Sequence, residues 1–223
     1  LAAAEKDAAA KKQALADVRE TQKRLPADPT ASPTGAGETP PFLVDNFDIP
    51  NPQIWRLIGG KWQYKDGHLL QQEVVKEHRS VSTQSTHPRD FTATFRFRII
   101  GGDTFHSVGL AFDYLDDAQC DGVYLSAYAI DSKLQVFHGR DGAKTYPQSA
   151  RVGMPVESGT EHVLRVDARD RLLNVWVDGR LRLAYSLPHE RREGRFALWT
   201  FDSAAEFLGV RVDPLPETAL LVD

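Results

Sequence analysis

Apolar and polar residues alternate in short runs from about residue 42 to residue 216, and Gly, Asp and Pro separate the runs. The clearest run is Phe91–Arg98, in which aromatic or Ala residues alternate with Thr and Arg. A period of two places the apolar side chains on one face of a β-strand and the polar ones on the other. Many such strands with turn residues between them predict a β-sandwich.

The pattern predicts about 11 to 13 strands, more than a small immunoglobulin-like domain has, and it suits a larger all-β jelly-roll sandwich. Two predicted hairpins turn at the Asp-Gly pairs 66–67 and 178–179, which favour the left-handed backbone of a tight turn. We expect strands over residues 42–47, 62–72 (a hairpin), 80–85, 91–99, 106–114, 122–130, 133–138, 162–168, 172–177, 181–186, 196–201 and 206–212.

The first part of the chain has a different composition. Residues 1–25 are rich in Ala and Lys, which are strong helix formers, and they predict an α-helix with a thin, Ala-rich apolar stripe. Residues 26–41 are rich in Pro, Thr and Gly and predict a linker. We therefore expect a tethered N-terminal helix, this linker, a β-sandwich over 42–216 and a tail over 217–223.

Charge and cysteine content exclude several classes of function. The formal net charge is −4 and the basic residues are spread along the chain, so we expect no nucleic-acid partner. No apolar run reaches the roughly 18–20 residues of a membrane span. Cys120 is the only cysteine, which excludes an internal disulfide and a CxxCH haem site in this segment. The chain begins with Leu rather than Met, which indicates a piece of a longer or processed protein.

Several segments follow one another in a familiar order: Asp45–Asp48, Gly59–Trp62, Tyr64–Leu69, Asp90–Phe97, Glu161–Val166, Asn174–Gly179, Gly194–Trp199 and Ala205–Phe207. In order and spacing they resemble a concanavalin A-like lectin/glucanase domain of the LamG-like kind over about residues 42–216. The resemblance implies a jelly-roll sandwich with a lectin-like, carbohydrate-binding role.

A narrower resemblance rests on the Ala-rich helix, the Pro-rich linker, Asp90-Phe91 and the segment His106–Asp113. Together they resemble sandwich domains found within the multidomain proteins of the Planctomycete cytochrome C family. This resemblance implies an exported, periplasmic or cell-envelope protein. It also implies that other domains of the parent protein are partners and that haem is carried there, with none in this segment.

Polar and aromatic side chains on shared strand faces predict a ligand surface, because such faces can stack sugar rings and donate hydrogen bonds to hydroxyls. Tyr124 and Tyr128 share one face, and Asn174 and Trp176 share another. For each tryptophan the alternative is sheet packing, and for His106 it is a hydrogen-bonded structural role. The candidate ligand-binding residues are Tyr124, Tyr128, Gln135, Arg140, Asn174, Trp176, Trp199 and His106.

Acidic residues near the first and last predicted strands offer a metal site. Asp45, Asp48 and Asp213 could meet where these strands pair, and hard carboxylate oxygens suit Ca²⁺. The alternative is that the three are ordinary acidic residues at strand ends, where Asp is common.

The glycosidases of this fold share a Glu-x-Asp-x-x-Glu strand motif, which supplies two carboxylates on one face. The sequence lacks the motif, and the nearest segment, Glu73–Glu77, has the wrong spacing. We therefore expect a non-catalytic carbohydrate- or ligand-binding module of a larger exported protein. One alternative is a structural module that positions neighbouring, haem-bearing domains. Another is a sugar-active enzyme of non-glucanase type, with His106, His138 and acids around a metal.

Overall fold

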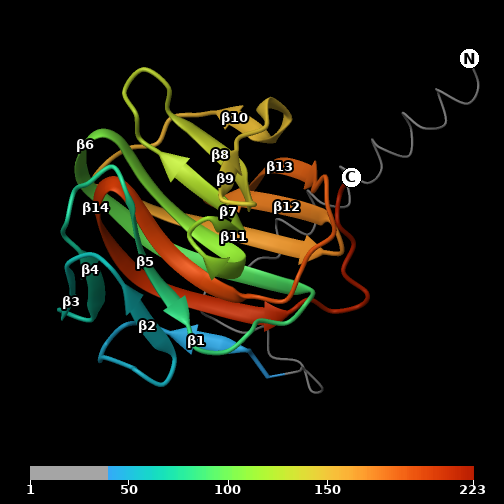
Figure 1. Ribbon diagram of the computed structural model, residues 1–223, viewed down its shortest axis with the longest axis horizontal. Helices are drawn as coiled ribbons and strands as arrows, with labels where there is room; N and C mark the ends of the chain where they lie inside the picture. Colours follow the sequence, from blue (N-terminus) through green and yellow to red (C-terminus); the bar gives the residue numbers. More distant parts are fainter. Residues whose placement is uncertain (1–39) are drawn as a thin grey trace, which may run out of the picture.

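A computed structural model describes residues 40–223, which are built almost entirely of β-strands (Figure 1). One short 3-10 helix, η1 (Gln148–Ala150), lies between β9 and β10. The strands are β1 (Leu43–Asp45), β2 (Trp55–Ile58), β3 (Trp62–Lys65), β4 (His68–Gln71), β5 (His78–Thr83), β6 (Phe91–Asp116), β7 (Gln119–Ser126), β8 (Lys133–Arg140), β9 (Ala143–Thr145), β10 (Arg151–Gly153), β11 (Glu161–Arg169), β12 (Leu172–Val177), β13 (Arg180–Ser186) and β14 (Arg195–Pro214).

The two longest strands, β6 and β14, run antiparallel to each other along almost their whole length (Figure 1). Arg195 pairs with Tyr114 at one end, and Pro214 pairs with Phe91 at the other. Register shifts interrupt the pairing near its middle, and irregularities of this kind bend strands. Gly102 lies at this point, where a Cβ would come within 2.2 Å of a carbonyl oxygen of β14. Glycine therefore allows the close approach of the two strands at the bend.

Each half of this long pair belongs to a different layer of the sandwich. The N-terminal half of β6 and the C-terminal half of β14 extend a sheet with the order β13-β12-β11-β6-β14-β1, here called the β11 layer. The other halves belong to a sheet with the order β10-β8-β7-β6-β14-β5-β2, here called the β7 layer. The hairpin β3–β4 adds to the C-terminal half of β14.

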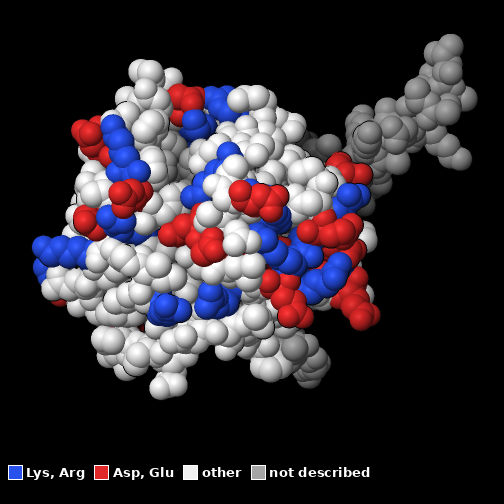
Figure 2. Space-filling model, viewed as in Figure 1, with Lys and Arg blue, Asp and Glu red and all other residues white. Residues whose placement is uncertain are grey.

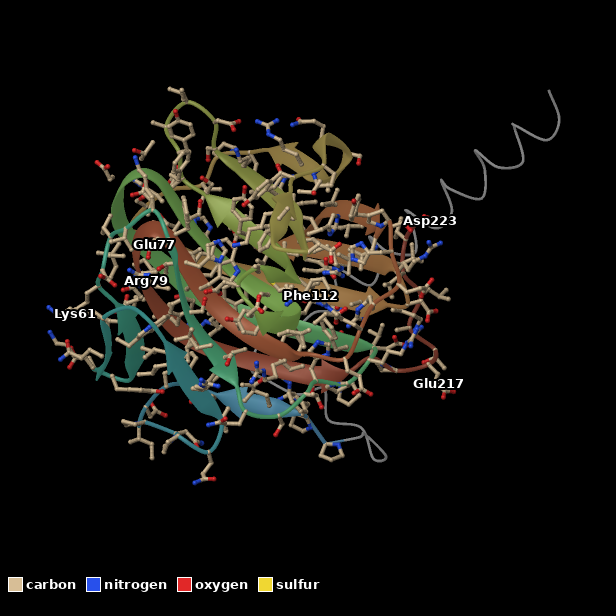
Figure 3. All side chains as sticks on the ribbon, in the orientation of Figure 1. Lys61, Glu77, Arg79, Phe112, Glu217 and Asp223 are labelled. Carbon is tan, nitrogen blue, oxygen red and sulfur yellow. The ribbon has the colours of Figure 1, made fainter. Side chains whose placement is uncertain are left out.

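The main core lies between the two layers and takes side chains from both. Phe95 and Phe97 come from the half of β6 in the β11 layer, and Leu110 and Phe112 come from the half in the β7 layer. Figure 3 places Phe112 near the centre of the molecule, and its side chain is fully buried. Burying one Phe side chain contributes roughly 1.5–3 kcal/mol to the stability of the fold, and for this reason the apolar faces of both layers turn toward each other.

The predicted all-β jelly-roll class is confirmed, and so are both Asp-Gly turns. Asp66 and Gly67 have φ of 53° and 74° between β3 and β4, and Asp178 and Gly179 have φ of 51° and 74° between β12 and β13. Both hairpins therefore use the left-handed backbone that the sequence predicted.

The structure differs from the sequence prediction in the length of two strands. The predicted strands 91–99 and 106–114 form one continuous β6, and 196–201 and 206–212 form one continuous β14. Left-handed residues such as His106, with φ of 47°, and the glycines nearby bend the chain without ending the pairing. Strands β2, β9 and β10 were not predicted, because three or four residues are too few to show a period of two.

The predicted helix over 1–25 and almost all of the predicted linker lie outside the described residues. Among residues 40–223, no helix is long and apolar enough to cross a membrane. The segment after β14 lies along the β11 layer, where the Arg169 guanidinium donates hydrogen bonds to the carbonyl oxygens of Pro216 and Ala219 at 2.5 Å each.

Candidate functional site

The outer face of the β7 layer carries a second apolar cluster, separate from the main core. Val108, Leu110 and Val123 point into the core, so the alternation of the strands turns Gly109 and Tyr124 outward. Aromatic rings from five strands and two loops gather there. We call this surface the aromatic face; its rings belong to His78, Phe105, Tyr124, Tyr128, Phe137, Tyr146, Trp199 and Phe201.

Trp199 of β14 forms the floor of the aromatic face. A Cβ on Gly109 would lie 2.5 Å from the indole, so only glycine lets the ring lie flat against the sheet. On its other side the ring of His78 stacks on the indole, with centroids 4.4 Å apart and planes 9° apart. Only 3% of Trp199 is exposed. The indole expected to stack against a sugar is therefore covered by the chain itself.

The other rings extend from this floor in both directions. Tyr124 and Phe137 lie 5.5 and 5.7 Å from the indole, and Tyr146 lies 5.7 Å from Phe137. In the other direction, Phe105 lies 5.8 Å from Phe201. Tyr146 is 46% exposed and Phe105 is 36% exposed, so both remain accessible to a ligand.

A cation and a neutral imidazole lie above the floor. Lys144 Nζ approaches His78 Nε2 at 2.9 Å, and it also lies 5.2 Å from the centroid of the Phe137 ring. Burial, followed by the charge of Lys144, lowers the pKa of His78 to about 3. Burial also lowers the pKa of Lys144. At neutral pH the imidazole is therefore uncharged and can accept a hydrogen bond from the ammonium group.

Two polar groups on this face have unusual surroundings. Among the described residues, the buried Trp199 Nε1 has no hydrogen-bond partner. A buried donor without an acceptor costs roughly 1–3 kcal/mol, so the indole N–H lowers the stability of this face. Burial raises the pKa of the Cys120 thiol to about 12, which keeps the thiol protonated and a poor nucleophile. The face is therefore suited to binding rather than to covalent chemistry at this cysteine.

The charged residues on the surface are mixed in sign. Figure 2 shows Lys and Arg interspersed with Asp and Glu across the face in view, with no extended region of one sign. Such a surface exerts no broad electrostatic attraction on an anionic polymer.

No protein-family model matches the chain, and the comparison with curated proteins finds no match. Solved structures do match. A carbohydrate-binding module, CBM66 from Bacillus subtilis, aligns with a TM-score of 0.61 at 20% identity, covering 71% of this chain and 94% of that one. The chain has a concanavalin A-like fold.

Two further structures support the same assignment. A β-glucanase from Bacillus licheniformis aligns with a TM-score of 0.60 at 10% identity, over 78% of this chain and 98% of that one. A Bacillus subtilis protein of unknown function with a galectin-like fold aligns with a TM-score of 0.61 at 13% identity, over 79% and 96%. At these identities the likeness concerns the concanavalin A-like fold and not the activity.

The concanavalin A-like sandwich does not bring all the predicted binding residues to one surface. Tyr124 belongs to the aromatic face, and Tyr128 lies at its edge, 5.3 Å from Phe105. Gln135 is the strand partner of Tyr124, but its Nε2 donates to the carbonyl oxygens of Pro147 and Ala150. The Gln135 amide is thus used to hold the loop that contains η1.

Asn174 and Trp176 do not lie on the aromatic face, since they point outward from the β11 layer. The Asn174 side chain exchanges two hydrogen bonds with the backbone of Val222, at 2.7 and 2.8 Å. The Trp176 indole donates to Asp167 Oδ2 at 3.0 Å. Both side chains have protein partners and hold the sandwich together on that side.

The remaining two candidates lie at bends and ends of strands. Arg140 Nη2 donates to Asp121 Oδ2 at 2.7 Å, at the end of the sandwich and away from the aromatic face. His106 lies at the bend of β6, and its buried Nδ1 has no partner among the described residues.

Two of the three predicted calcium ligands, Asp45 and Asp213, accept hydrogen bonds from the protein. Asp45 accepts hydrogen bonds from the Phe47 backbone and from the Trp55 indole, both at 2.7 Å. Asp213 accepts two hydrogen bonds from Arg211 at 2.7 Å. The described residues do not bring Asp45, Asp48 and Asp213 together into a group of cation size.

Sequence reasoning missed most of the rings on the aromatic face. His78 and Tyr146 lie in or beside strands whose alternation is weak, and Phe105 lies in the bend of β6. One signal was present in the sequence. Phe137 has the same strand parity as Gln135, so it could have been placed on the face of Tyr124.

Proposed function

We propose that the chain is a non-catalytic carbohydrate- or ligand-binding module that binds its ligand on the aromatic face. The observation that carries this proposal is the continuous set of rings on the outer face of the β7 layer, which ends in the exposed Tyr146 and Phe105. The likeness to a carbohydrate-binding module and to a galectin-like fold supports the proposal at the level of fold.

The chemistry of the face favours a glycan. Exposed rings can stack against the C–H faces of sugars, as polar-tipped aromatics do on other binding surfaces. The Lys144 amine and the hydroxyl of Tyr146 lie beside these rings and can bind sugar hydroxyls. Because the surrounding charges are mixed, we infer a ligand without a high charge density.

The wider context is also a proposal. The module would belong to a larger exported protein, periplasmic or of the cell envelope, whose other domains carry any haem. The resemblance of its sequence to such sandwich domains supports this context. In that setting the module would hold the parent protein on a glycan.

One observation favours a second candidate function, a structural module that binds another domain or protein. The indole of Trp199 is covered by His78, so fewer rings are free to stack than a deep groove would offer. A surface with exposed aromatic rings can also pack against a protein partner. A sugar-active enzyme of non-glucanase type has no comparable support on this face.

The test is a glycan-array and calorimetric screen of the whole chain, with and without Ca²⁺, against neutral, acidic and sulfated oligosaccharides. We expect specific binding that Tyr146→Ala weakens by at least tenfold. The matched control is Val44→Ala, which removes a similarly exposed apolar side chain from β1. If Val44→Ala lowers the glycan affinity as much as Tyr146→Ala does, the aromatic face is not the binding site. No binding to any oligosaccharide class would refute the glycan proposal and favour the interaction module.

A further inference from the structure

A group of metal-ligating side chains lies at one end of the sandwich, on the other side of the β7 layer from the aromatic face. Asp121 of β7 and His138 of β8 are paired strand neighbours, and their parity is that of Val123 and Val136, which point into the core. His189 reaches the same place from the loop between β13 and β14. Residues distant in sequence are therefore brought to one point.

The distances within the group fit a small cation. His138 Nδ1 lies 3.0 Å from Asp121 Oδ1, and His189 Nε2 lies 3.2 Å from both Asp121 oxygens. One donor atom from each residue lies within 4.8 Å of the other two. In a tetrahedral zinc site with bonds of about 2.0–2.1 Å, neighbouring ligand atoms are roughly 3.3–3.4 Å apart. The two distances from the carboxylate to the imidazoles therefore need to lengthen by only a few tenths of an ångström.

The outer contacts are those that metal ligands usually have. The second nitrogen of His138, Nε2, lies 2.9 Å from the hydroxyl of Tyr185, and the two rings are stacked at 14°. Arg140 donates to Asp121 Oδ2, while Oδ1 faces the two imidazoles, where an ion would lie. Metal-bound histidines and carboxylates are commonly oriented by such second hydrogen bonds.

Tyr185 can serve both states of His138. With a metal on Nδ1, the ring carries its proton on Nε2 and donates to the hydroxyl oxygen. Without a metal, Nδ1–H donates to Asp121, and the hydroxyl of Tyr185 donates to Nε2. A hydroxyl can do either, because it is both donor and acceptor. The contact therefore remains satisfied when an ion enters or leaves.

We propose that Asp121, His138 and His189 form a binding site for a divalent transition metal ion, with Zn²⁺ as the best fit. Two imidazoles and one carboxylate are a ligand set that suits zinc, whereas Ca²⁺ prefers oxygen ligands only. Three protein ligands leave a fourth position for water or a ligand atom. The His189 side chain is 24% exposed, which gives the ion a path from the surface.

This site is independent of the glycan-binding proposal, because its side chains point away from the aromatic face. The competing explanation is a hydrogen-bonded polar cluster that needs no ion. The two explanations predict different results when a metal is added. A polar cluster without a metal site would bind no stoichiometric zinc, and removing one of its histidines would leave zinc binding unchanged.

The experiment uses the untagged whole chain, treated with a chelator and desalted. Titration with Zn²⁺ by calorimetry, and elemental analysis after desalting, should give one tightly bound equivalent. Co²⁺ should give the visible absorption of a four-coordinate ion. We expect His189→Ala to abolish stoichiometric binding and to remain folded, since its side chain is partly exposed. The matched control is His162→Ala, which breaks a His–Asp pair with Asp178 that has no second histidine.

A second variant tests the outer contact. Tyr185→Phe should weaken zinc binding by about 10- to 100-fold while one equivalent still binds at saturation. Circular dichroism should show that each variant is folded. The assignment would be overturned by a folded native chain that binds no stoichiometric zinc. It would equally be overturned if His189→Ala bound zinc as tightly as the native chain.

Discussion

The outer faces of the two layers each contain a tryptophan, and the two residues have opposite surroundings. On the β11 layer, Trp176 donates its indole hydrogen to Asp167, and the guanidinium of Arg165 lies 5.3 Å from its ring. On the β7 layer, Trp199 has a buried Nε1 with no partner among the described residues. Trp199 is nevertheless the more buried of the two, with 3% of the residue exposed compared with 7% of Trp176.

The difference shows that the alternation of apolar and polar residues does not determine whether the outer face of a layer is covered by the chain or available to a ligand. The chain itself completes the β11 layer, since Asn174 holds the backbone of Val222 and Trp176 is hydrogen-bonded. Within residues 40–223, the β7 layer has a donor without a partner, Trp199 Nε1, and a half-buried amine, Lys144, beside exposed rings. A buried unpaired donor costs roughly 1–3 kcal/mol, a cost that Trp176 avoids through its hydrogen bond to Asp167.

The largest expected effect concerns the floor of the aromatic face. Trp199→Ala should lower the free energy of unfolding by about 3–5 kcal/mol, because a large buried side chain is removed and its cavity remains. Urea unfolding of the variant measures the loss. Trp62→Ala, which removes a partly buried indole from the hairpin β3–β4, should cost less. A loss below about 1 kcal/mol at Trp199 would mean that its packing contributes little.

Two histidines, one from each layer, should show opposite pH dependence. The folded pKa of His78 is lowered to about 3 from an unfolded value near 6.5, so its contribution to stability is present above pH 6.5 and is lost as the pH falls toward 3. The hydrogen bond to Asp178 raises the folded pKa of His162, so its contribution is present below pH 6.5 and is lost as the pH rises through the raised value.

Thermal unfolding between pH 3 and pH 8 checks this pair of histidines. His78→Gln should flatten the pH dependence below pH 6.5, and His162→Gln should flatten it above. An NMR titration of His78 with a midpoint near 6.5 would contradict the predicted burial of its neutral form.

A smaller effect is expected where the C-terminal segment meets the β11 layer. Asn174→Ala removes two hydrogen bonds to Val222 and should lower stability by about 1–2 kcal/mol. Hydrogen exchange should show faster exchange of the Val222 amide and no change on the aromatic face. Unchanged protection of Val222 would mean that other contacts, such as those of Arg169, hold the segment.

The fold could be predicted from the sequence because its signals are local. The alternation in Phe91–Arg98 fixes the two faces of a strand, and the pairs 66–67 and 178–179 fix two turns. The assignment of strands to layers is not local, since it depends on the pairing of β6 with β14 across about a hundred residues.

The candidate site could be predicted only in part for the same reason. Tyr124 and Trp199 were expected to bind a ligand, and the structure brings them together through the neighbouring strands β6, β7 and β14. Trp176 was grouped with them, although only tertiary pairing shows that it faces outward from the other layer. Nothing in the local sequence relates Asp121 to His189, which are 68 residues apart.

The central claim is that the aromatic face, and not the outer face of the β11 layer, binds the ligand. The most direct measurement follows the indole N–H signals of the tryptophans by NMR during titration with the oligosaccharide that binds best in the screen. The signal of Trp199 should shift with saturation while that of Trp176 stays in place. A shift of Trp176 without a shift of Trp199 would contradict the claim.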